Sequence, residues 1–326
     1  AGRHNPRRIR FDKDRSTRIT TQLGGGQFID VTGKFATATR CNPLSLLGEA
    51  ENHAYVTEWL ILAIEDEDGF RLTPTQKQDI FDAVQILAGY SREQWTLSFF
   101  ATLIHADLRE RLQLWMKGGQ YGDFFDNVED AFQISDDLTI EMGELLINYE
   151  RAAVLFLDYA FFRISKSMDG QRFTLIEIEE AGFFFKYERF YRRLETWLTT
   201  IRKLNGAVWM ATQSLRQISR IADFEVLKET IANFIYLPNS LANTSKNLYC
   251  DTFGLTVDQV QMINDAVPNR DYLWVTRTTS RMLQTDFKPE MVARLRSDGR
   301  AQAVFDKHYM KGDGWEERYV RELLAA

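Results

Sequence analysis

The chain of 326 residues is long enough for about two domains of ordinary size. Hydrophobic residues make up 44% of it and charged residues 26%, which excludes a disordered or fibrous protein. The net charge of −6 argues against a protein that binds DNA through bulk charge alone. The sequence has no apolar run of about 18 residues that could span a bilayer. Its two cysteines, Cys41 and Cys250, lie in no metal-binding motif.

The first segment shows short strand patterns separated by a turn. Apolar and polar residues alternate at 8–12, and a second short apolar run lies at 28–31, so we expect a strand at each. The triplet Gly24-Gly25-Gly26 stands just before the second run. A phosphate-binding loop needs a helix with a Lys after its glycines, and here a strand pattern follows. We therefore interpret the triplet as a turn.

From about residue 50 to residue 162 the pattern is helical, with apolar residues three and four positions apart. The pair Thr73-Pro74 is typical of a helix N-cap followed by the first helical residue. Glu141 and Glu144 fall in this stretch. We expect them on the solvated face of a helix and not at a carboxylate metal site.

After residue 170 strand and helix patterns alternate. Buried strands are expected at 173–178 and 207–211, with a long amphipathic helix at 184–203 between them. Further elements are expected as a strand at 233–237, a helix at 256–266, and strands at 272–276 and 282–287. This order predicts right-handed crossovers and a parallel sheet, in which functional groups gather at the carboxyl ends of the strands.

The expected strand at 173–178 ends in two adjacent carboxylates, Glu179 and Glu180. This is the shape of a Walker B element, in which the first carboxylate holds Mg²⁺ and the second orients the water that attacks a γ-phosphate. The usual first residue is Asp, and Glu179 is one methylene longer. An ordinary polar strand end remains the alternative interpretation of the pair.

The second expected strand ends in Thr212-Gln213-Ser214. In motors with a RecA-like sheet, a polar residue at this strand tip senses the γ-phosphate, and Gln213 carries suitable donor and acceptor groups. Thr212 or Ser214 could equally serve as the N-cap of a following helix, and the two roles are compatible.

Arg202 and Lys203 stand near the end of the helix between these two strands, just before Asn205-Gly206. Cations at a helix C-terminus are favourable in themselves, and Asn-Gly is a typical helix stop. A second possible role for Arg202 is that of an arginine finger that reaches the nucleotide of a neighbouring subunit.

The order of these motifs resembles the conjugative-transfer and type IV secretion ATPases of the TraC and CagE kind. The resemblance covers nearly the whole chain. It rests on Phe11-Asp12-Lys13-Asp14, Leu23-Gly24-Gly25, Asn42-Pro43-Leu44, Gly119-Gln120-Tyr121-Gly122 with Phe125-Asp126-Asn127, Glu179-Glu180-Ala181, Arg202-Lys203-Leu204-Asn205-Gly206 and Ala211-Thr212-Gln213-Ser214.

The resemblance implies an α/β fold with a RecA-like P-loop NTPase sheet and an inserted all-α lobe. The expected divisions are residues 1–48 as the first part of the α/β domain, 49–165 as the all-α lobe, 166–290 as the rest of the α/β domain, and 291–326 as C-terminal helices. It also implies a bacterial hexamer at the cytoplasmic face of the inner membrane, where it works with other secretion subunits in pilus biogenesis and substrate transfer.

The resemblance further implies ATP and Mg²⁺ as cofactors. By this likeness Glu179 is the magnesium residue, Glu180 the catalytic carboxylate, Gln213 the γ-phosphate sensor and Arg202 a candidate finger. The residues that would bind the nucleotide itself are not identified.

Two departures from the family pattern stand out. The family normally has Asp-Glu-Ala-Trp where this chain has Glu179-Glu180-Ala181-Gly182. In addition, no phosphate-loop motif of the form GxxxxGKT or GxxxxGKS occurs in the sequence. Since that loop normally lies upstream of the strand at 8–12, we expect a C-terminal fragment of a longer ATPase, inactive by itself.

Two other functions remain open. A related DNA-translocating hexamer should show a basic loop facing a central pore, and the sequence offers no convincing one. A nucleotide-free scaffold subunit would keep the fold without catalysis. The absent phosphate loop favours the scaffold, whereas the retained Glu180 and Gln213 argue against it.

Overall fold

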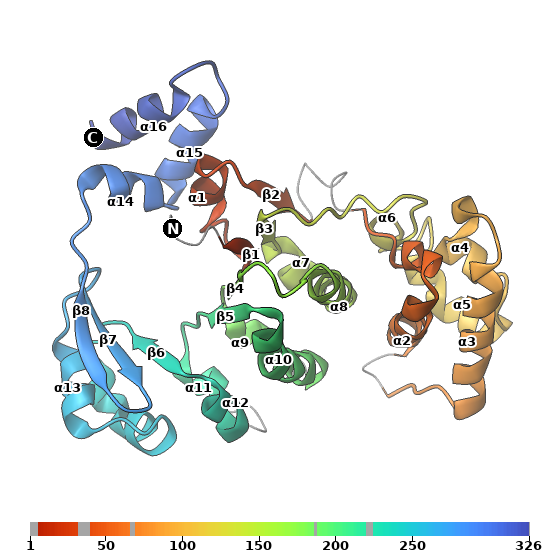
Figure 1. Cartoon of the computed structure of the whole chain (residues 1–326), viewed down its shortest axis with the longest axis horizontal. Helices are drawn as coiled ribbons and strands as arrows, with labels where there is room; N and C mark the ends of the chain where they lie inside the picture. Colours follow the sequence, from red (N-terminus) through yellow and green to blue (C-terminus); the bar gives the residue numbers. More distant parts are fainter. Residues whose placement is uncertain (1–5, 32–39, 66–68, 186–187, 220–223, 326) are drawn as a thin grey trace. The chain divides into compact units, whose positions relative to one another are not determined.

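The computed structural model describes residues 6–31, 40–65, 69–185, 188–219 and 224–325 (Figure 1). The chain divides into two compact units, one of residues 1–15 and 25–174 and the other of residues 16–24 and 175–326. Among the described helices, none is long and apolar enough to cross a membrane.

The first unit contains a parallel three-stranded sheet. Its strands are β1 (Arg7–Asp12), β2 (Gln27–Asp30) and β3 (Asp137–Glu141), in the order β2-β3-β1. The register pairs the last residues of β1 and β2 with the last residue of β3, so all three strands end at one edge. The expected strands at 8–12 and 28–31 are thus confirmed, and the glycine triplet does form a turn before β2.

Strand β3 corrects the prediction of an entirely helical stretch at 50–162. Its residues Leu138, Thr139 and Ile140 are fully buried. A short apolar run that is buried on both faces has no alternating pattern, so periodicity cannot separate it from a buried helix. Consequently Glu141 lies at a strand end and not on a solvated helix face.

The helices of the first unit surround a core rich in aromatic side chains. Their bounds are α2 (His53–Ile64), α3 (Pro74–Ala88), α4 (Leu97–Phe100), α5 (Ala106–Leu112), α6 (Gly122–Phe125), α7 (Gly143–Asn148) and α8 (Glu150–Lys166). The indole of Trp59 donates to the Leu155 carbonyl at 3.1 Å, and that of Trp115 to the Ala63 carbonyl at 2.9 Å. Both rings are buried, and these bonds satisfy their only polar atoms.

Helix α3 begins as the sequence predicts. The Thr73 hydroxyl accepts from the Gln76 backbone N–H, the Gln76 side chain accepts from the Thr73 N–H, and Pro74 is the first helical residue. This reciprocal capping box satisfies donors that a helix start otherwise leaves unpaired.

The buried Asn42 joins three separate segments of the first unit. Its side-chain amide donates to the Trp95 carbonyl at 3.0 Å and to the Val128 carbonyl at 3.1 Å. Its Oδ1 accepts from the Leu44 N–H at 3.0 Å. One side chain thus replaces water for backbone groups from three loops.

The second unit contains the remaining elements. Its first part consists of α1 (Arg18–Leu23), β4 (Thr174–Ile178), which starts at the unit boundary, α9 (Ala181–Phe184), α10 (Glu188–Thr200), β5 (Gly206–Met210), α11 (Leu215–Ile218) and α12 (Phe224–Thr230). The later elements are β6 (Asn233–Tyr236), α13 (Val257–Asp265), β7 (Asp271–Thr276), β8 (Ser280–Gln284), α14 (Pro289–Leu295), α15 (Gly299–His308) and α16 (Trp315–Leu324).

The last three strands correct the prediction of a parallel sheet throughout. β6, β7 and β8 form a separate sheet in which both pairs are antiparallel. Only three residues, 277–279, separate β7 from β8. A connection this short can join only antiparallel neighbours, because a parallel crossover needs a dozen residues or more.

Helix α1, which the sequence patterns did not predict, packs with the C-terminal helices. Its Ile19 shares a buried cluster with residues of α14, α15 and α16, including Phe305 and Tyr319. The Tyr319 hydroxyl donates to the Ala293 carbonyl at 3.1 Å within this cluster. The six residues of α1 are too few for a clear helical period, so this long-range packing stabilises it.

Replacing Asn42 with Ala should lower the free energy of unfolding by about 3 kcal/mol, because the Leu44 N–H and the Trp95 carbonyl would be left buried without partners. Asn148→Ala is the matched control, since Asn148 is exposed at the end of α7, and its effect should stay within about 0.5 kcal/mol. Urea unfolding of both variants measures the difference. Equal effects would show that Asn42 has no such joining role.

Candidate functional site

Strand β4 leads directly into the two carboxylates. Along the strand Thr174, Ile176 and Ile178 are buried, and the residues between them are half-buried. Glu179 and Glu180 form a turn before α9 starts at the buried Ala181. The structure therefore places both carboxylates at the carboxyl end of β4, where the sequence predicted them.

The backbone of Glu180 is in the left-handed region, with φ of +55°. A non-glycine residue adopts this conformation only at an energetic cost, because its Cβ approaches the backbone carbonyl. Such strain persists where the surrounding structure holds it, and it concentrates at functional sites. The turn at Glu180 redirects the chain from β4 into α9.

Two backbone hydrogen bonds hold the ends of β4 and β5 together. The Ala211 N–H donates to the Ile178 carbonyl at 2.9 Å, and the Ala181 N–H donates to the Ala211 carbonyl at 2.7 Å. Since these residues follow the two strands, the strands run in the same direction. The segment after β5, with Thr212 and Gln213, thus starts beside the Glu179-Glu180 turn.

The polar residues after β5 divide into capping residues and one exposed residue. The Ser214 hydroxyl accepts from the Gln217 N–H at the start of α11, which confirms the capping alternative for Ser214. Thr212 Oγ1 accepts from the Ser214 N–H at 3.2 Å. Gln213 is exposed and takes no part in these bonds. Its amide is therefore accessible at the strand tip.

Gln217, which the sequence patterns did not single out, lies beside Glu180. A Cβ placed on Gly182 would be 2.5 Å from Gln217 Oε1 and 3.3 Å from Glu180 Oε1. Both side chains therefore use the space that any larger residue at position 182 would fill. The spacing Ser-x-x-Gln from Ser214 is a capping-box signal in the sequence, but it predicts a local role and not this approach to Glu180.

Arg202 lies apart from the other predicted site residues. It is exposed in a 3-10 turn at Ile201–Leu204, before β5 starts, whereas Gln213 follows the end of β5. Within the part of the chain that the structure describes, its side chain forms no ion pair or hydrogen bond. The five residues of β5, about 16 Å of strand, separate it from the carboxylate turn.

β5 itself is less buried than the sequence predicts. It pairs with β4 and ends its row of strands, and its Trp209 side chain is 65% exposed. An apolar run predicts burial on both faces only for an inner strand, and β5 lies at an edge.

Three carboxylates gather at the carboxyl edge of the first unit's sheet. Asp12, Asp30 and Glu141 end β1, β2 and β3, and all three are buried. Glu141 accepts from the Gly143 N–H at 2.8 Å and from the Arg15 N–H at 2.7 Å. The Arg15 guanidinium pairs with Asp30 at 2.8 Å. These bonds hold the acidic side chains in place without water.

Burial raises the pKa of Glu141 to about 7, and the neighbouring charges of Asp12 and Asp30 raise it further, against the lowering effect of the two backbone N–H bonds. Among the residues that the structure describes, no group of three or more His, Cys, Asp or Glu side chains has the arrangement of a metal site. We therefore interpret the cluster of Asp12, Asp30 and Glu141 as a buried network of the turn that follows β1.

Comparison with known proteins gives relatives over almost the whole chain. A probable conjugal transfer protein TrbE of Sinorhizobium fredii is 27% identical over 89% of this chain and 44% of its own length. The conjugal transfer protein TrbE of Rhizobium radiobacter is 27% identical, with 92% and 36% covered. The type IV secretion system protein virB4 of Bartonella henselae is 29% identical, with 91% and 37% covered. No protein-family profile matches the chain.

The homologues of this chain are TrbE and VirB4 proteins of conjugal transfer and type IV secretion. The resemblance that the sequence motifs indicated is thereby confirmed. The chain spans between 36% and 44% of the length of these three relatives.

The fold is likewise confirmed as a RecA-like α/β fold. The structure of VirB4 from Thermoanaerobacter pseudethanolicus matches with a TM-score of 0.65, and the match covers 88% of this chain and 83% of that one. At 16% identity this similarity supports the fold.

The free energy of unfolding should fall by about 3 kcal/mol as the pH rises from about 4.5 to about 7, because folding raises the pKa of Glu141 and so favours its protonated form. The contribution is present in full below the unfolded pKa and is lost above the folded one. Urea unfolding at about pH 5 and about pH 8 measures it. In Glu141→Gln this component should vanish, and an unchanged pH dependence in that variant would contradict the assignment.

At position 180 Gly should give a more stable protein than Ala, by about 1 kcal/mol, because only Gly adopts the left-handed backbone without strain. At Glu195, inside α10, the order should be reversed, since Gly weakens a helix relative to Ala. Thermal unfolding of the four variants compares the two positions. Ala above Gly at position 180 would mean that the Glu180 backbone is unstrained.

Proposed function

We propose that this chain is part of an ATP-hydrolysing motor of a type IV secretion or conjugation system. The observation that carries the proposal is the pairing of the ends of β4 and β5, which brings the Glu179-Glu180 turn beside the segment of Gln213. The homology to conjugal transfer and type IV secretion proteins supports the same assignment.

Glu180 is the proposed catalytic carboxylate. It is half-buried, and its side chain forms no hydrogen bond or ion pair within the described part of the chain. Such a carboxylate can accept a hydrogen bond from water and orient it for attack. The rigid left-handed turn fixes the direction in which this carboxylate projects.

Glu179 and Gln213 have the other proposed roles at this edge. The carboxylate oxygens of Glu179 are ligands of the hard type that Mg²⁺ prefers. The exposed amide of Gln213 can donate to a phosphate oxygen and accept from water. ATP and Mg²⁺, when bound, would supply the γ-phosphoryl group and the neutralising charge.

Arg202 is proposed to act on a neighbouring subunit. Within one chain it is separated from Glu180 by the length of β5, and its guanidinium has no partner in the described part. A hexamer with nucleotide at the subunit interfaces would allow such a residue to stabilise charge on the adjacent site. Assembly at the cytoplasmic face of the inner membrane with other secretion subunits belongs to the same proposal.

DNA is not favoured as the substrate that the chain contacts directly. The net charge is −6, and the basic N-terminal segment is engaged within the fold. Arg8 and Arg10 both pair with Asp137, at 2.6 and 2.5 Å. A pore-facing basic loop, which a DNA translocase needs, is not evident in the sequence.

A scaffold subunit without nucleotide is the second candidate function. The specific observation in its favour is the lack of a phosphate-loop motif in the 326 residues. The backbone and Lys of that loop supply most contacts to the β- and γ-phosphates in motors of this type. The described residues near Glu180 provide carboxylates and amides but no equivalent loop.

ATP hydrolysis should be negligible for this chain and measurable for a version lengthened at its N-terminus by the residues that its gene encodes upstream. In the lengthened protein Glu180→Gln should reduce the turnover number at least about 100-fold, because the water-orienting carboxylate is lost. Glu290→Gln, at an exposed position of α14, is the matched control and should leave turnover unchanged.

Two results would contradict the motor assignment. Unchanged turnover in Glu180→Gln would remove the catalytic role of this carboxylate. A lengthened protein that neither binds nor hydrolyses ATP would favour the scaffold function.

A further inference from the structure

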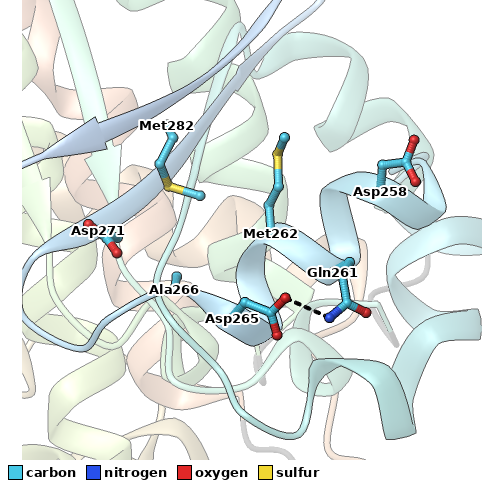
Figure 2. Close-up of a pocket in the computed structure, with 7 residues that line it drawn as sticks. All are labelled: Asp258, Gln261, Met262, Asp265, Ala266, Asp271 and Met282. Carbon is cyan, nitrogen blue, oxygen red and sulfur yellow. Dashed lines mark hydrogen bonds between the residues drawn. The ribbon is translucent and has the colours of Figure 1, made fainter.

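The open edge of β8 and the groove beside it suggest an interaction surface. The groove lies between α13 and the β7–β8 pair, with a cavity volume of about 330 Å³. Figure 2 shows its lining residues, with the methionine side chains rising from α13 and β8. The lining consists of Asp258, Gln261, Met262, Asp265, Ala266, Asp271 and Met282.

The outer edge of β8 has backbone groups that the sheet leaves unused. In the antiparallel register Thr285 donates to Arg270 and Thr276 to Thr279, which fixes the hydrogen-bonded pairs as alternate residues. Arg281 and Leu283 therefore face β7 with their N–H and C=O groups. The corresponding groups of Ser280, Met282 and Gln284 point outward.

No other described segment covers this edge. β8 ends its sheet, all five of its side chains are exposed, and no backbone bond joins its outward groups to another described segment. Proteins usually protect an edge with a bulge, a proline or a very short strand, whereas β8 has Met282 37% and Leu283 39% exposed. Such an edge is a template for an added strand.

The groove lies on the same face of the sheet as the side chain of Met282. A residue of an added strand that is directly opposite Met282 would project its side chain onto this face, because paired residues share a face. Its side chain would enter the groove over Met262 and Met282. The residues next to it in the added strand would point to the other face, toward Leu283.

The charge of the groove selects the side chain that fits. Asp258, Asp265 and Asp271 contribute carboxylates around the two methionines. Arg270, 3.7 Å from Asp271, is the nearby cation, and the alternation of β8 places Arg281 on the opposite face. A Lys or Arg side chain matches this lining, since its aliphatic part can lie on methionine while its charge reaches a carboxylate.

We propose that the edge of β8 binds an extended segment of a partner protein, which adds a strand to the sheet and places a Lys or Arg side chain in the α13–β8 groove. The residues that flank this basic side chain are apolar and pack toward Leu283. The proposal goes beyond the motor function and does not depend on it.

The test uses the full chain and acetylated heptapeptides of sequence Thr-Ser-Val-X-Val-Ser-Thr with X as Lys, Arg, norleucine or Glu. Titration by NMR measures affinity, and amide hydrogen exchange measures new hydrogen bonds. The Lys and Arg peptides should bind at least about fivefold more tightly than the Glu peptide. The amides of Ser280, Met282 and Gln284 should gain protection, while those of Arg281 and Leu283, already paired with β7, should not change.

Two variants separate the strand edge from the groove. Met282→Pro removes one outward N–H without breaking a bond to β7, and it should abolish binding of every peptide. The double variant Asp258→Asn with Asp265→Asn should remove the preference for Lys while the norleucine peptide binds as before. Asp286→Asn is the matched charge control outside the groove.

Three outcomes would overturn the proposal. These are equal binding of the Lys and Glu peptides, absence of new protection at the outward amides, and concentration-dependent protection of these amides in the chain alone. The last outcome would identify a second copy of the chain as the occupant of the edge.

Discussion

The arrangement of the candidate site depends on two backbone hydrogen bonds that join the ends of β4 and β5. They fix the positions of Ile178, Ala181 and Ala211, and therefore the distance across which the turn at Glu180 and the tip at Gln213 face each other. Neither bond involves a side chain, so the geometry depends on strand pairing and not on the identity of the catalytic groups. The departures from the family pattern at Glu179 and Gly182 are consistent with this, because the backbone frame can form around either residue type.

The two carboxylate groups of this protein show how the same chemical group behaves differently in two surroundings. Glu180 is half-buried, has no partner among the described side chains and lies on a strained backbone, which leaves its charge available. Glu141 lies among Asp12 and Asp30, is held by two backbone N–H donors and has its pKa raised by burial. An acidic residue at a strand's carboxyl end is therefore not sufficient evidence for catalysis, since only its environment separates a reactive group from a structural one.

Local patterns in the sequence predicted those elements whose signals are local. The strand at 8–12, the cap at Thr73 and the carboxylates after β4 follow from alternation, capping chemistry and motif order. The sequence did not predict β3, α1 or the antiparallel pairing of β7 with β8, because each of these depends on contacts between distant segments or on a short connection. In the site, the approach of Gln217 to Glu180 was equally hidden, since it arises from the absence of a side chain at Gly182.

The exposed edge position of β5 has one more consequence. Trp59, Trp95, Trp115 and Trp197 are buried, whereas the indole of Trp209 is largely in contact with solvent, four residues before Gln213. The emission of an indole shifts to longer wavelength in water and is quenched by soluble acrylamide, while enclosed rings resist both effects. The protein thus has an intrinsic fluorophore on the strand that leads to the candidate sensor, and its red-shifted, quenchable emission would report directly on whatever comes to cover that edge.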